Sequence, residues 1–159
     1  MEPPILPALP LLIEKVVSPL VNAKVAFVAG NPLGTIALCG FVAEMIALML
    51  YEMANDDGRA GGVSTDEFES QWQHERVKIL HTLGIINQDV KEKLDIIRKE
   101  RRKYLHFISK DHSLVFEDAL RVYANSITIL VDLVGQEFDN GAWVPKPAFA
   151  RYLRKHGLL

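Results

Sequence analysis

The strongest constraint on the fold of this chain is a long apolar stretch over residues 32–51. It carries one charged side chain, that of Glu44, and it is long enough to cross a bilayer as a helix. No Lys or Arg lies close to either end to anchor such a span, and Glu52, Asp56 and Asp57 follow at once. A central bundle helix that its neighbours cover has the same composition. We therefore expect a helical bundle, with a membrane span as the weaker alternative.

Turn and capping residues divide the chain into helical segments with short connections. Ser18-Pro19 and Asn31-Pro32 each place a capping side chain before a proline, a common start of a helix. Ser64 and Glu67 have the spacing of a capping box, and Asn87 opens a further helix. The sequence predicts an all-α, up-and-down bundle of four to five main helices with a short C-terminal helix. The expected helices cover residues 18–29, 32–54, 64–84, 87–108, 114–135 and 149–155.

The length of 159 residues suits one domain with a real core. We expect an apolar, proline-rich segment over residues 1–17, the bundle over 18–135, and a loop with a short basic helix over 136–159. The net charge of -2 means that any contact with nucleic acid must come from a local patch. The single cysteine, Cys39, and a start without the basic residues of a secretory signal both favour the cytoplasm.

One arginine interrupts the apolar stripe of the helix expected over residues 87–108. Val90, Leu94 and Ile97 recur at helical spacing, and the stripe resumes with Tyr104, Leu105 and Ile108. The position between these two groups, 101, holds arginine. A guanidinium on an inward face costs free energy unless it is paired or faces a cleft. Arg101 is therefore our first candidate for a functional residue.

His106 follows Arg101 by five residues, and the long arginine side chain can reach toward the same groove. Imidazole gives or takes a proton near neutral pH, and guanidinium binds phosphate oxygens. The surrounding basic side chains form a local positive patch, in which we expect RNA contacts from Arg98, Arg102, Lys103 and Lys110.

Structural interpretations of the same residues remain open. A basic run on a helix is usually a solvated face, and Arg101 can pair with Glu44 as a buried ion pair. His74 and His81 lie seven residues apart, too far along a helix to share a metal ion, and we expect no metal or cofactor.

The run Arg101-Arg-Lys-Tyr-Leu-His106 resembles the Arg-x4-6-His motif of the HEPN superfamily of helical-bundle proteins. Residues 80–86 and, after a short gap, 94–106 are similar to the paired-helix core of that group, nearest the branch of mannitol-operon-repressor-like proteins. Residues 26–34, leading to Glu44, look like its first hairpin. The resemblance covers roughly residues 20–130 of the chain.

The resemblance implies a metal-independent RNA endonuclease of toxin or defence type that acts as a homodimer. His106 would activate the ribose 2′-hydroxyl or protonate the leaving oxygen, Arg101 would hold the scissile phosphate, and Glu44 would orient one of them. Arg102 stands where members of the group frequently have Asn or another small polar residue, a change that leaves phosphate binding intact.

Other members of that superfamily are regulatory or interaction modules without nuclease activity. The alternative function is therefore a non-catalytic module of the mannitol-operon-repressor type, with a cognate antitoxin or a regulatory protein as partner. A DNA-binding repressor is a weaker third hypothesis, because the sequence shows no recognition-helix pair of helix-turn-helix size.

Overall fold

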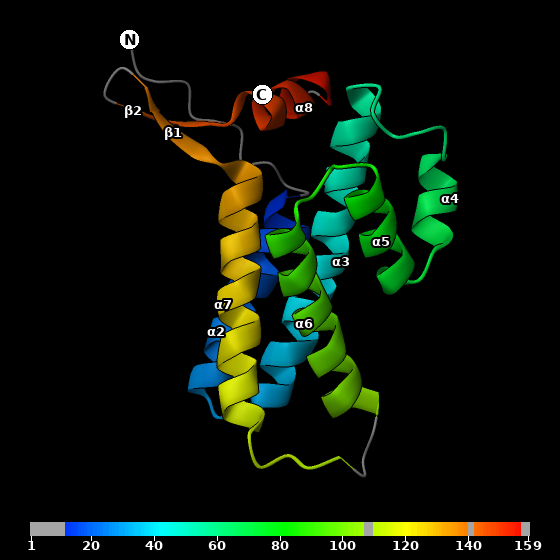
Figure 1. The fold of residues 1–159 in the computed structure, drawn as a ribbon. Helices are drawn as coiled ribbons and strands as arrows, with labels where there is room; N and C mark the ends of the chain where they lie inside the picture. The colour runs from blue at the N-terminus through cyan, green and yellow to red at the C-terminus, as the bar shows by residue number, and fades with distance from the viewer. Residues whose placement is uncertain (1–11, 107–109, 140–141, 157–159) are drawn as a thin grey trace.

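The computed structural model describes residues 12–106, 110–139 and 142–156, and the four long helices among them form an up-and-down bundle (Figure 1). These are α2 (Ser18–Val28), α3 (Pro32–Asp56), α6 (Gln88–His106) and α7 (Val115–Val134), and each runs opposite to the one before it. The predicted all-α bundle is confirmed. The shorter elements are η1 (Ile13–Val17), α4 (Thr65–Ser70), α5 (Gln73–Thr82), β1 (Gln136–Asp139), β2 (Ala142–Pro145) and α8 (Pro147–Lys155).

The helix α3 lies at the centre of the bundle and packs against α2, α6 and α7. Its side chains Ile36, Val42 and Ile46 are fully buried, as is Cys39. Burial raises the pKa of the Cys39 thiol to about 11, although a hydrogen bond with Ser126 opposes the shift. Cys39 is thus a core residue with little thiolate.

By length and composition α3 could cross a membrane, a test that core helices of soluble proteins also pass, and 44% of its most apolar window is buried.

Three of the expected caps form as the sequence predicts. The Asn31 side chain accepts a hydrogen bond from the Gly34 amide at 2.9 Å, and Asn87 accepts one from Val90 at 2.9 Å. Ser64 and Glu67 make both bonds of a capping box. These signals are local, so each of the three helices begins where its cap predicts.

The α-helix α2 begins at Ser18, as predicted, but the predicted capping role of Ser18 is wrong, because no side chain caps this helix. The π-helical turn η1 runs directly into α2, and the residue before α2, Val17, has helical backbone angles. Val16 in this turn is fully buried in the main core. Apolar packing therefore extends the helix past the Ser18-Pro19 signal toward the N-terminus.

The helix predicted over residues 64–84 is broken in two. Gln71 and Trp72 have extended backbone angles, so α4 ends and α5 begins anew at Gln73. The break lets Phe68 stack on Tyr51 of α3, with ring centroids 4.0 Å apart. Arg76 donates to the backbone oxygen of Phe68 at 3.2 Å, which also accepts a hydrogen bond from the amide of Gln71 at 3.2 Å, so both sides of the break are tied together.

The loop predicted after residue 135 contains a short antiparallel hairpin. β1 pairs with β2 in the register Gln136 to Pro145 and Asp139 to Ala142. The dipeptide Asn140-Gly141, outside the described residues, is the sequence signal for such a hairpin. The basic C-terminal helix is confirmed as α8, which buries Phe149 and Leu153.

Candidate functional site

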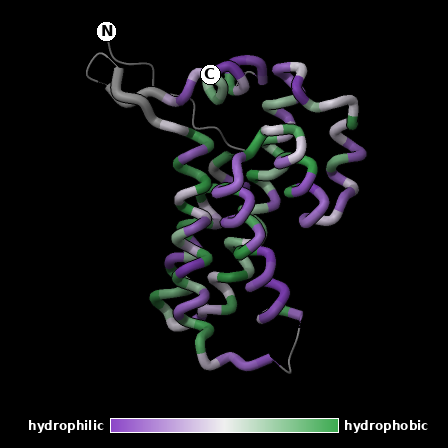
Figure 2. Tube along the Cα trace, viewed as in Figure 1, coloured by the Kyte–Doolittle hydropathy of each residue, from purple (hydrophilic) through white to green (hydrophobic). Residues whose placement is uncertain are grey.

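Most of the apolar stripe on α6 faces the core. Val90, Leu94, Ile97 and Tyr104 are buried, as the spacing predicts. Leu105 is 38% exposed and does not belong to the stripe, and Ile108 lies outside the described residues. Hydrophilic residues gather along the remaining surface of α6 (Figure 2).

The Arg101 side chain lies across α3 at Gly40. A Cβ atom at position 40 would lie 2.3 Å from Cδ of Arg101 and 3.0 Å from its Nε, far inside van der Waals contact. Gly40 thus provides the space in which the arginine stem crosses the neighbouring helix. Glu44 lies one turn further along α3, and its carboxylate accepts a hydrogen bond from Nη1 of Arg101.

This ion pair leaves donor capacity on the guanidinium. Nε of Arg101 is covered and has no hydrogen-bond partner among the described residues. The pair is also not sealed from solvent, since the Arg101 side chain is 36% exposed and that of Glu44 is 28% exposed. A guanidinium carries five N–H donors, so Glu44 can orient it while other donors stay open to a ligand.

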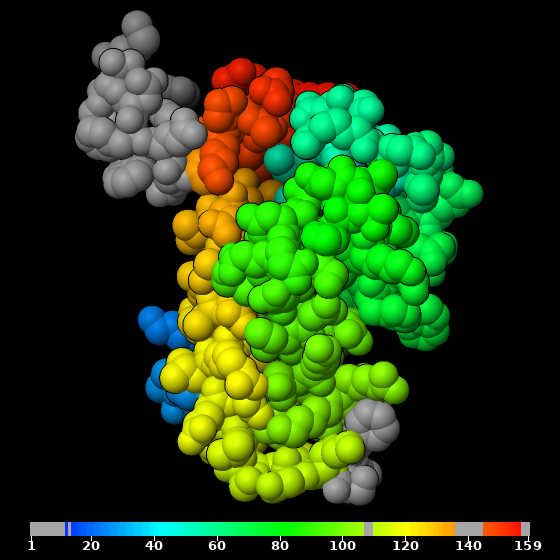
Figure 3. Space-filling model, in the orientation of Figure 1, coloured from blue at the N-terminus to red at the C-terminus, as the bar shows by residue number. Residues whose placement is uncertain are grey.

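A groove of about 590 Å³ lies between α3, α5 and α6 around this ion pair. The packed surfaces of α5, α6 and α7 can be followed on one face of the molecule (Figure 3). Leu94, Ile97 and Ala43 give the groove an apolar floor, and its polar lining comes from Glu44, Gln73, His74, Arg98, Arg101, Arg102 and His106.

The three predicted catalytic residues therefore share one groove, together with two of the four predicted RNA contacts. Glu44 comes from α3, whereas Arg101 and His106 come from α6, where His106 is exposed at the last described residue of the helix. Arg98, which also lines the groove, donates to Asp95 on its own helix at 3.2 and 3.3 Å. Asp95 offsets part of the positive charge on that wall.

Lys103 and Lys110 do not line this groove. Lys110 is exposed in the connection between α6 and α7. Lys103 points to the opposite side of α6, where its ammonium donates to Asp118 at 3.1 Å. The structure therefore separates Lys103 from the candidate site.

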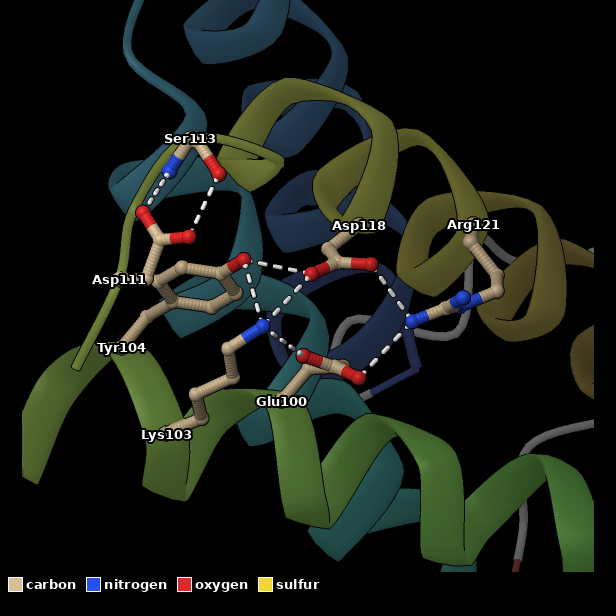
Figure 4. Close-up of polar contacts among 7 residues, drawn as sticks. All are labelled: Glu100, Lys103, Tyr104, Asp111, Ser113, Asp118 and Arg121. Carbon is tan, nitrogen blue, oxygen red and sulfur yellow. Dashed lines mark hydrogen bonds and ion pairs between the residues drawn. The ribbon is translucent and has the colours of Figure 1, made fainter.

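The contacts of Lys103 belong to a network between α6 and α7 (Figure 4). Tyr104 donates to Asp118 at 2.5 Å, and Arg121 bridges Asp118 at 2.6 Å and Glu100 at 2.8 Å. Burial raises the pKa of Asp118. Hydrogen bonds from Tyr104 and Lys103 and the charge of Arg121 lower it by more than burial raises it, so the pKa of Asp118 is below its ordinary value. Hydrogen bonds with Tyr104 and Asp118 raise the pKa of Lys103 above its usual range. We call these five residues the Asp118 network.

Trp72, Gln73 and His74 also line the groove, a placement that the sequence did not predict. They reach it because the chain breaks between α4 and α5, where a continuous helix was expected. The amide of Gln73 donates to the backbone oxygen of Ala43 on α3 at 3.3 Å. His74 forms a 3.2 Å contact with Glu75 and is half exposed. The groove therefore holds two histidines, from α5 and from α6.

Comparisons of the chain with known protein families, with curated protein sequences and with solved structures found no match. Among the described residues, no group of three or more His, Cys, Asp or Glu side chains is arranged to hold a metal ion.

Proposed function

We propose that this chain is a HEPN-like RNA endonuclease that needs no metal ion. The observation that carries the proposal is the convergence of Arg101, His106 and Glu44 on one groove. Phosphate-binding and proton-transferring side chains in one concave site are what phosphodiester cleavage requires. The proposal rests on this convergence and on the motif.

In the proposed reaction, Arg101 binds the non-bridging oxygens of the scissile phosphate. The Arg101 side chain is 36% exposed and lines the groove, so its terminal amino groups can bind an oxyanion while Nη1 keeps its bond to Glu44. Glu44 acts as a positioning residue, because it fixes the orientation of the guanidinium plane. Charge grows on the phosphate oxygens in the transition state, and a fixed cation there lowers the barrier.

Cleavage also needs one group that accepts a proton and one that supplies it. His106 takes the proton of the ribose 2′-hydroxyl, whose oxygen attacks phosphorus, and the 5′-oxygen leaves with a proton from His74. The products are a 2′,3′-cyclic phosphate and a 5′-hydroxyl, and the two histidines exchange protonation states. We assign the proton donor's role to His74 because it lines the same groove from α5.

The quaternary and cellular setting follows from the same proposal. The chain would act as a homodimer in which two motif helices meet, in the cytoplasm, as a toxin or defence nuclease with a cognate antitoxin as a further partner. Size-exclusion chromatography with light scattering tests the dimer directly.

A non-catalytic regulatory or interaction module is the second candidate. The ion pair between Arg101 and Glu44 favours it, because such a pair can serve packing alone. It predicts that a dimer or a partner complex survives unchanged when His106 is replaced.

The nuclease proposal is tested with purified protein and end-labelled single-stranded and structured RNA in excess chelator. Wild type is compared with His106→Ala and with His81→Ala, a matched control on α5 whose side chain does not line the groove. We expect cleavage by wild type and His81→Ala, and a loss of about 100-fold or more for His106→Ala, the usual scale of general acid–base catalysis. Equal or absent cleavage in all three proteins would contradict the proposal.

A further inference from the structure

The indole of Trp72 is a second feature of the groove that the proposed reaction does not use. Trp72 is 79% exposed, and it is the largest of the strongly exposed apolar side chains among the described residues. Most of the others lie on α2 and α7, whereas Trp72 lines the groove opposite the arginines of α6. Leaving so much aromatic surface in water forgoes the free energy of burial.

The backbone beneath Trp72 is held on both sides. Its carbonyl accepts hydrogen bonds from the amides of Glu75 at 2.9 Å and Arg76 at 3.0 Å. The Arg76 side chain in turn donates to the carbonyl of Phe68, whose ring stacks on Tyr51 in the core. The exposed ring therefore stands on a fixed support, so stacking on it costs little ordering of the backbone.

The opposite wall supplies positive charge. Arg98, Arg101 and Arg102 line the groove from α6, while Trp72 lines it from the junction of α4 and α5. An aromatic face beside a row of cations is the combination with which proteins bind single-stranded nucleic acid, because the cations follow the phosphates and each base stacks on a ring.

Gln73 adds a polar group next to the indole. Its Nε2 is held by the backbone oxygen of Ala43, while its Oε1 is covered and accepts no hydrogen bond among the described residues. A base edge with an N–H donor would satisfy this oxygen after a small side-chain movement. A polar atom left without a partner in a groove lining is costly unless a ligand satisfies it.

We propose that Trp72 is a stacking site for one unpaired nucleobase, which makes the groove specific for single-stranded RNA. The inference rests on the proposed RNA substrate, but it concerns binding and not cleavage. A base within a duplex cannot stack on Trp72, because its faces are occupied by its neighbours.

The test measures binding of a short 2′-O-methyl oligoribonucleotide, which lacks the attacking hydroxyl and cannot be cleaved. The chain has two tryptophans, so Trp143→Phe leaves Trp72 as the only indole, and its fluorescence reports stacking directly. The same oligonucleotide annealed to its complement is the duplex probe. Trp72→Ala and Trp72→Phe are compared with Phe116→Ala, an exposed aromatic on α7 away from the groove.

We expect quenching of Trp72 fluorescence by the single strand and weaker binding of the duplex. Trp72→Ala should lower the affinity for the single strand by about tenfold, since a base stacked on an aromatic ring contributes about 1–3 kcal/mol. Trp72→Phe should retain most of the affinity, and Phe116→Ala all of it.

Absence of quenching, equal binding of duplex and single strand, or wild-type affinity of Trp72→Ala would each overturn the stacking site. Cleavage is measured separately on unmodified RNA. A nuclease with none of these binding signatures would refute the stacking site alone, and quenching without cleavage would refute the nuclease alone.

Discussion

The helix α6 presents two charged clusters on different faces, and they differ in how open they are to solvent. In the Asp118 network, both carboxylate oxygens of Asp118 accept hydrogen bonds, from Tyr104 and Lys103 on one side and from Arg121 on the other. Asp118 itself is only 5% exposed. A buried carboxylate with this set of donors is a packing element between α6 and α7.

On the groove face of the same helix, a partly exposed ion pair borders an open cavity. Arg101 has one carboxylate partner in Glu44, a covered Nε without a partner, and an open cavity beside it. Neither the number of charges nor unused hydrogen-bonding capacity separates the two clusters, because Oε2 of Glu100 in the Asp118 network is also covered and without a hydrogen-bond partner. What separates them is the open groove beside Arg101. We take the Asp118 network as structural and the groove as functional, and the following predictions test that division.

The largest effect is expected from Gly40→Ala. The new methyl group would lie 2.3 Å from Cδ of Arg101, so the arginine must leave its path to Glu44. Because displacements of about 1 Å can cost 100-fold in rate, we expect cleavage to fall by about that factor. Stability should change by less than about 1 kcal/mol, since Ala favours the helix and the arginine can move. In an Arg101→Gln background, Gly40→Ala should lower cleavage no further; an additive loss would contradict the mechanism.

Asp118→Ala should produce the largest loss of stability. It leaves Tyr104 without an acceptor and removes the charge that holds Lys103 and Arg121. Both cations are partly exposed, so we expect about 2 kcal/mol, less than the loss of about 3–5 kcal/mol for a fully buried pair. Urea unfolding followed by circular dichroism measures it. RNA cleavage per folded molecule should stay at the wild-type level, and a catalytic loss at equal folded fraction would break the comparison.

Features of the fold and the site that depend on near neighbours in the chain could be predicted from the sequence. The caps at Asn31, Ser64 and Asn87 were predictable because each depends on neighbours within three residues. Arg101 was found because it breaks a helical period on its own helix. Its pairing with Glu44 was foreseeable, because Glu44 carries the single charge in the apolar body of α3.

What the sequence could not supply depends on the packing between helices. Gly40 matters only because α6 crosses α3 at that level. The break that brings Trp72 to the groove depends on Phe68 reaching Tyr51, a contact between distant segments. Lys103 lies two residues from Arg101, about 200° around the helix, so helical geometry alone separates the two faces. Its acceptor on α7 required the structure.

A smaller effect is expected from the pH dependence of the Asp118 network. The folded-state pKa of Asp118 is below its ordinary value of 3.8. Its carboxylate therefore stabilises the fold above that value, and this contribution is lost as the pH falls through the folded pKa. The difference in unfolding free energy between wild type and Asp118→Asn should be greatest near about pH 5 and shrink toward about pH 2. Urea titrations at constant ionic strength measure it; a difference independent of pH would show that charge plays no part.

The smallest effect concerns Arg102 on the groove wall. Arg102→Gln should weaken binding of a non-cleavable RNA several-fold and lower the slope of log affinity against log salt by about one, as for one lost phosphate contact. Fluorescence anisotropy over a salt series measures both. An unchanged slope would remove Arg102 from the RNA contacts.

The most direct test of the central claim compares Arg101→Gln with Lys103→Gln, the same chemical change to a basic side chain on two faces of one helix. For each variant, the unfolding free energy and the rate of RNA cleavage in chelator are measured on the same preparation. The division into two faces predicts that Arg101→Gln lowers cleavage by about 100-fold with little loss of stability, and that Lys103→Gln lowers stability while cleavage persists. The opposite pattern, or two variants that behave alike, would contradict it.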